Sequence, residues 1–130
     1  MPQRLAQLRR ELARLVRELR PDVVAVEKVF FQTNVRTAMS VGQASGVALL
    51  TAVEAGCEVI EYTSNEVKLA VTGDGAAGKQ QVQEMVMRLL GLATRPTPPD
   101  VADALGLALT HIATAPFRRA VALAAQGGQR

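Results

Sequence analysis

Three carboxylates occupy positions in the sequence where an ordinary surface acid is not expected. Glu27 directly follows the apolar run Val23–Val26, and Asp100 and Asp103 stand three residues apart at the start of an apolar helical segment. A carboxylate at the end of a buried strand is costly unless it is paired, protonated or bound to a metal. Residues three apart lie on one face of a helix, so Asp100 and Asp103 can act together. The three carboxylates could therefore hold divalent cations, which prefer hard oxygen ligands.

Each of these acids also has an ordinary structural explanation. The strand could reach solvent at Glu27, so that its carboxylate simply meets water. Asp100 follows two prolines and could cap the N-terminus of the helix, with Asp103 as its capping partner. The residues alone leave both explanations open.

The segment Gly73–Lys79 is close to a phosphate-binding P-loop in its glycine spacing. It departs from that motif because Gln80 stands where Ser or Thr must contact magnesium. The segment before it is also predicted to be helical, where the motif requires a strand. A nucleotide-binding module is therefore disfavoured, although the glycines could let Lys79 approach a phosphate backbone closely.

Two adjacent aromatic residues, Phe30 and Phe31, follow the apolar run. Neighbouring residues on a strand point to opposite faces, so one of the two is expected in the core. The other is then free to stack on a nucleic-acid base. By contrast, His111 on an apolar helix and the single cysteine, Cys57, are interpreted as structural.

These residues need a framework of alternating helices and strands to position them. Apolar residues at spacings of three and four predict helices, and continuous or alternating apolar runs predict strands. The small residues of Gly42–Gly46 indicate that something packs very close to the second helix. The element order is that of an α/β fold, in a single domain over residues 1–130 with a flexible tail from about residue 116. The predicted helices cover about 5–19, 35–55, 64–71, 79–90 and 100–113, and the predicted strands cover 22–31 and 58–63.

Composition narrows the class of protein. The chain of 130 residues has a net charge of +3, which weakly favours a polyanionic partner. No apolar stretch is long enough to span a bilayer, and the arginine-rich, amphipathic N-terminus is not a signal peptide. One cysteine excludes an internal disulfide and indicates a reducing compartment. We expect a cytoplasmic protein without a membrane partner.

Motifs follow one another along nearly the whole chain, at Pro21–Phe30, Gly42–Gly46, Val67-Lys68, Gly73–Lys79 and Asp100–Leu105. In this order they resemble the RuvC family of Holliday-junction resolvases. The resemblance implies an RNase H-like α/β fold, in which helices flank a mixed sheet. It also implies a homodimer that nicks two strands of a four-way junction by magnesium-dependent phosphodiester hydrolysis, in homologous recombination and DNA repair. Two Mg²⁺ per active site, with Mn²⁺ as a substitute, and the branch-migration proteins RuvA and RuvB as partners belong to the same expectation.

The resemblance assigns roles by position in this sequence. It implies that Glu27, Asp100 and Asp103 are the catalytic, metal-binding carboxylates. It further implies DNA binding by Lys68, Lys79 and Phe30, and a dimer interface at Gly42, Ser45 and Gly46. Phe31, the neighbour of Phe30, is the other candidate for the contact with bases.

The sequence departs from the family's pattern at its beginning. The family starts with a strand that carries a first metal-bridging aspartate, followed by a hairpin, whereas no Asp or Glu precedes Glu11 here. We therefore expect three of four carboxylates, impaired cleavage and an exposed edge on the strand that begins at Asp22. A non-cleaving, junction-binding dimer is the alternative to an endonuclease.

Overall fold

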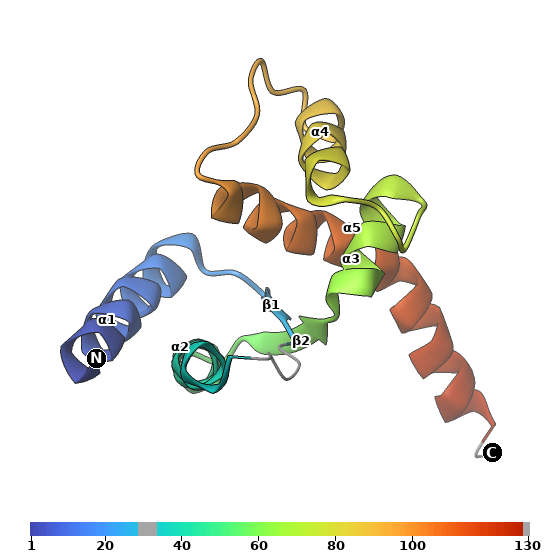
Figure 1. Cartoon of the computed structure of the whole chain (residues 1–130). Helices are drawn as coiled ribbons and strands as arrows, with labels where there is room; N and C mark the ends of the chain where they lie inside the picture. Colours follow the sequence, from blue (N-terminus) through green and yellow to red (C-terminus); the bar gives the residue numbers. More distant parts are fainter. Residues whose placement is uncertain (29–33, 129–130) are drawn as a thin grey trace. The chain divides into compact units, whose positions relative to one another are not determined.

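The computed structural model describes residues 1–28 and 34–128, which form two compact units, Met1–Thr63 and Ser64–Arg130. Two strands and two helices of the described residues belong to the first unit, and three helices belong to the second (Figure 1). Phe30 and Phe31 lie outside the described residues. That the chain forms a single domain stays a prediction.

The first unit begins with helix α1 (Pro2–Leu19), which packs against α2 (Val35–Glu54). Proline suits the first helical position because its missing N–H would have no partner there. The helix ends where Arg20 adopts a left-handed conformation with φ 47°, and the Arg20 N–H donates to the carbonyl of Val16 at 2.9 Å. On the apolar face of α1, the half-buried residues are Leu5, Leu8, Leu12 and Val16.

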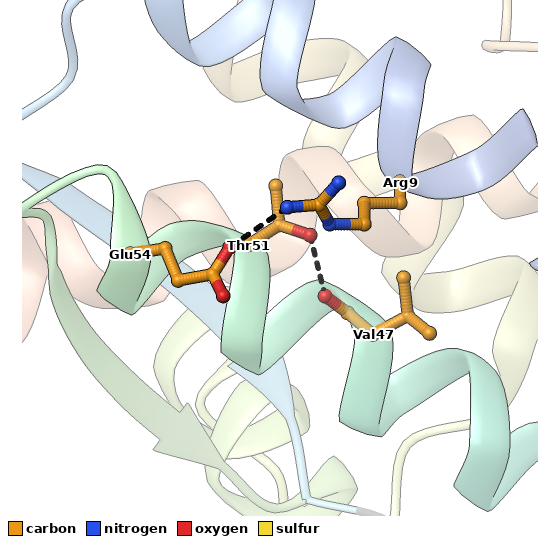
Figure 2. A network of polar contacts seen from close by, with 4 residues as sticks. All are labelled: Arg9, Val47, Thr51 and Glu54. Atoms are coloured by element: carbon orange, nitrogen blue, oxygen red, sulfur yellow. Dashed lines mark hydrogen bonds and ion pairs between the residues drawn. The ribbon is translucent and has the colours of Figure 1, made fainter. Parts of the chain in front are cut away.

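Figure 2 shows two polar contacts near the place where α1 meets α2. The Arg9 guanidinium donates from Nη2 to Oε2 of Glu54 at 3.1 Å, with side chains that are 59% and 50% exposed. Such an exposed pair contributes little to stability. Thr51 is buried, and its hydroxyl donates to the carbonyl of Val47 at 2.7 Å. The buried hydroxyl is therefore satisfied within α2.

Strands β1 (Val23–Glu27) and β2 (Glu58–Tyr62) form a parallel pair that α2 connects. Val23 lies opposite Glu58, and Glu27 lies opposite Tyr62. Residues 23–26 are only half-buried, so β1 is less buried in the described part of the chain than its continuous apolar run predicts. The physical reason is that β1 has a hydrogen-bonded neighbour on one side only in the described part of the chain.

The second unit packs α3 (Ser64–Thr72), α4 (Lys79–Leu89) and α5 (Pro99–Gly127) against one another. A Cβ built at Gly106 would lie 3.2 Å from Cγ1 of Val67, so glycine permits the close approach of α5 to α3. The buried core of this unit consists of Val67, Val71, Ala77, Val82, Val86, Ala102, Gly106 and Thr110.

Helix α5 continues to Gly127, beyond its predicted end near Ala113. Pro116 lies inside the helix, and the alanine-rich residues after it favour helical backbone strongly enough to continue it. Whether this exposed segment is flexible stays a prediction. Among the described residues, no helix combines the length and apolar character needed to cross a membrane.

Candidate functional site

Glu27 is the last residue of β1 and stands at the carboxyl end of the parallel strand pair. Its cross-strand neighbour Tyr62 is only 2% exposed, whereas Glu27 is exposed. The next N–H along the chain, that of Lys28, donates to the carbonyl of Tyr62 at 2.8 Å. The carboxyl ends of parallel strands are where α/β sheets place ligands. The strand does reach solvent at Glu27, and this exposure leaves the carboxylate accessible to a ligand.

Asp100 and Asp103 are not the capping pair that one explanation of the sequence required. The N-cap of α5 is Pro98, and no side chain forms a cap hydrogen bond there. The helix begins at Pro99 because proline suits the first helical position, which makes Asp100 the second helical residue and Asp103 the fifth. Capping therefore does not account for the two acids. Asp100 retains the modest stabilisation that the helix dipole gives an acid in the first turn.

Lys79, the first residue of α4, contacts Asp103 on α5. Its Nζ lies 3.7 Å from Oδ2 of Asp103, and the two side chains are 64% and 45% exposed. An exposed pair of this kind is weak, so a phosphate or a cation can replace either partner. The sequence analysis assigned roles to both residues but missed their pairing. No periodicity could have shown it, because it arises only from the packing of α4 on α5.

The loop before Lys79 is closed by its own hydrogen bonds. Gly73 has φ +79° and its N–H donates to the carbonyl of Leu69 at 2.9 Å, which ends α3. Asp74 then accepts from the Ala76 N–H at 2.8 Å through its carboxylate and from the Ala77 N–H at 3.1 Å through its carbonyl. Two N–H groups are thus engaged inside the loop and cannot cradle a phosphate. The preceding segment is helical, as the argument against a P-loop predicted.

Lys68 lies in the middle of α3 and is half-buried. Its neighbour Val67 is buried in the core beneath Gly106, and the carbonyl of Lys68 accepts from the Thr72 hydroxyl at 2.7 Å. The backbone at Lys68 is therefore fixed by packing and by a hydrogen bond. The predicted role of its side chain in DNA binding stays a prediction.

The two glycines in the small-residue region of α2 have open space beside them among the described residues. Gly42 and Gly46 are exposed, and a Cβ built at either one would meet nothing within 4 Å. Ser45 is half-buried. Helical spacing aligns the two glycines with exposed apolar side chains into one stripe, which we call the α2 stripe. It consists of Val35, Met39, Gly42, Gly46, Leu50 and Val53.

The predicted carboxylates are distributed over both units. Asp100 and Asp103 share the N-terminal part of α5, whereas Glu27 belongs to the first unit. Within each unit, the described residues contain no group of three or more His, Cys, Asp or Glu side chains placed to hold a metal ion. That the three carboxylates share one metal site stays a prediction. Their chemistry fits it, since exposed carboxylate oxygens are ligands that hard divalent cations accept.

Comparison with known proteins gives a consistent result. The sequence model of the family described as crossover junction endodeoxyribonuclease RuvC matches residues 1–111. RuvC of Rubrobacter xylanophilus is 56% identical over 111 residues, which are 85% of this chain and 62% of that relative. RuvC of Salinispora arenicola is 52% identical over 130 residues, which are 100% of this chain and 74% of that relative.

Solved structures agree with these matches. The Thermus thermophilus RuvC structure is 38% identical with a TM-score of 0.79, covering 88% of this chain and 69% of that one. A structure of T. thermophilus RuvC in complex with Holliday junction substrate is 36% identical, with the same TM-score and coverage. The predicted RNase H-like α/β fold class is confirmed. The chain belongs to the RuvC family of crossover junction endodeoxyribonucleases.

Proposed function

We propose that this protein is a structure-specific endonuclease that resolves four-way DNA junctions in recombination and repair. The observation that carries the proposal is the family match over residues 1–111. It is supported by the likeness to a RuvC protein whose structure was solved with Holliday junction substrate. The acids Asp100 and Asp103, which helix capping does not explain, add a chemical reason.

Hydrolysis would depend on divalent cations held by Glu27, Asp100 and Asp103. We propose two Mg²⁺ per active site, with Mn²⁺ able to substitute, because the donors are carboxylate oxygens. When bound, such ions supply electrostatic stabilisation of the charge that develops on a phosphodiester. Asp100 and Asp103 would present their carboxylates from one face of α5, a rigid support.

The basic and aromatic residues would hold the DNA. Lys79 already neutralises Asp103 across 3.7 Å, so its ammonium can move to a backbone phosphate when a cation takes over that role. Lys68 would add a second phosphate contact. Such contacts hold the register of the DNA without reading its sequence. Phe30 or Phe31 would stack on bases near the crossover.

The α2 stripe would form the homodimer interface. Its apolar side chains Met39, Leu50 and Val53 are exposed. Gly42 and Gly46 leave space for a second backbone, because nothing in the described chain would lie within 4 Å of a Cβ added at either position. A second copy of this chain would bury the stripe and place two active sites in one molecule, as symmetric nicking requires. Cooperation with RuvA and RuvB is retained from the resemblance, and a cytoplasmic location is retained from the composition.

Binding and cleavage should be measured side by side, on a labelled four-way junction and on a linear duplex of equal length. We expect selective binding of the junction without divalent cations. In Mg²⁺, the D100N/D103N variant should lose about 100-fold or more of the cleavage rate while retaining binding, since metal stabilisation is worth several kcal/mol. The control E58Q/E61Q removes two exposed carboxylates from β2 and should cleave as the parent does.

Two outcomes would redirect the proposal. Selective junction binding without cleavage in either Mg²⁺ or Mn²⁺ would support the alternative, a non-cleaving junction-binding dimer. Equal affinity for junction and duplex would contradict both functions, because neither then recognises the branched structure.

A further inference from the structure

The positive charge of the chain is concentrated in its first helix. Residues 1–20 contain six arginines and two glutamates, a net charge of +4. The whole chain carries +3, so residues 21–130 together carry −1. Because α1 packs on α2 through its apolar face, most of this charge must lie on the surface that faces away from α2. A polyanion would therefore be attracted chiefly by α1.

Three of these arginines form one continuous stripe, which we call the α1 arginine stripe. Arg10, Arg14 and Arg17 follow one another at spacings of four and three residues, which places them on one helix face. All three are exposed. Leu8 and Leu12 are half-buried, and helical spacing places them on the opposite face of α1.

Little of this positive charge is neutralised within the protein. Among the described residues, Arg10 and Arg17 form no ion pair, and Arg14 pairs only with Glu18, at 3.3 Å. Both members of that pair are more than half exposed, so the contact is weak and can be exchanged. The other acid of the helix, Glu11, accepts a hydrogen bond from Gln7. The stripe therefore presents nearly its full charge to solvent.

We propose that the α1 arginine stripe binds the phosphate backbone of a duplex DNA arm. This inference rests on the proposed function, because it supposes a DNA substrate with double-stranded arms. Arg10 and Arg17 are about 10.5 Å apart along the helix axis. Each DNA strand offers a phosphate about every 3.4 Å along the axis of the duplex, so a stripe parallel to that axis spans about three phosphates of one strand. An anionic membrane is a poorer fit, because the apolar face of α1 that would insert is covered by α2.

The test compares the salt dependence of duplex binding between variants of the whole chain, in EDTA so that nothing is cleaved. Each phosphate contact contributes a slope of about 0.9 to the plot of log affinity against log salt. The R10Q/R14Q/R17Q variant should therefore lose about 2 to 3 from that slope. Its matched control, R88Q/R118Q/R119Q, removes the same charge from α4 and α5 and should retain the parent slope. The R10K/R14K/R17K variant keeps the charge and should also retain the parent slope.

The outcomes separate this inference from the proposed function. Circular dichroism checks that the R10Q/R14Q/R17Q variant is folded. If the folded variant keeps the parent slope, the proposed role of the α1 arginine stripe is wrong, even if junction binding stays selective. An equal loss of slope in the α4 and α5 control overturns it too, since net charge alone would then explain the effect. Loss of binding to anionic phospholipid vesicles, with duplex binding intact, would assign the stripe to a membrane and contradict the inference. A parent chain that binds neither duplex nor junction refutes the proposed function itself.

Discussion

Helices α2 and α5 both contain glycines in their interiors, but the two sites differ in what surrounds them. At Gly106 of α5, an added Cβ would lie 3.2 Å from Val67 and 4.0 Å from Val86. At Gly42 and Gly46 of α2, it would meet nothing within 4 Å. An interior glycine costs about 0.5–1 kcal/mol relative to alanine, so each site needs a reason. At α5 the reason is packing within this chain, and at α2 we propose that it is a second chain.

The largest effect on the free energy of unfolding is expected at Gly106, where neighbouring side chains already fill the space. The G106L variant forces a four-carbon side chain against Val67 and Val86, both buried in the core of the second unit. Overpacking of this kind should lower the free energy of unfolding by about 3 kcal/mol, the upper end of the usual range. Urea unfolding followed by circular dichroism measures it. A variant as stable as the parent would show that α5 can move away from α3 at little cost.

The same substitution on α2 should act on association instead of folding. In a monomer, G42L/G46L should raise stability, because leucine has a better helix propensity than glycine by about 0.8 kcal/mol at each site. In the proposed dimer, the added side chains separate the two copies of the stripe. We expect the dimer dissociation constant, measured by analytical ultracentrifugation, to rise at least about 10-fold, which corresponds to about 1.4 kcal/mol.

The G127A variant is the matched control for this experiment. It also replaces an exposed glycine with no atom within 4 Å of an added Cβ, but it lies near the end of α5. It should leave the dissociation constant unchanged. If G42L/G46L raises stability and leaves the association state of the protein unchanged, the proposed interface on α2 is wrong.

Much of the framework could be predicted because local signals mark its boundaries. The predicted helices over 35–55 and 79–90 correspond to α2 and α4, each with its end one residue earlier. Asn34 caps α2 by accepting from the Thr37 N–H at 3.3 Å, and Gly78 is the N-cap of α4. The end of α5 was missed, because the predicted helix stopped at about residue 113 and the residues after Pro116 were assigned to a flexible tail. Helix propensity after that proline outweighed the loss of one backbone donor.

The candidate site was less predictable, because it depends on contacts between distant residues. The residue types of Asp100 and Asp103 suggested metal ligands, and the structure removed the capping explanation for them. The ion pair of Asp103 with Lys79 had no local signal. Family membership, inferred from motifs in order, is confirmed. The shared metal site with Glu27 stays a prediction, since it joins residues of two units.

The smallest effect on stability is expected at the ion pair between α1 and α2 in the first unit. Unlike the packing of α5 on α3 at Gly106, this contact is exposed to solvent. Arg9 and Glu54 meet at 3.1 Å, but both side chains are at least half exposed. Water competes for both charges, and ordering two long side chains costs entropy. A double-mutant cycle of R9A and E54A should therefore give a coupling energy of about 0.2–1 kcal/mol that decreases as salt is added. A coupling above about 2 kcal/mol, insensitive to salt, would mean that the pair is shielded from water in solution. The ion pair would then contribute more to holding α1 on α2, and apolar packing less, than the exposure of the two side chains indicates.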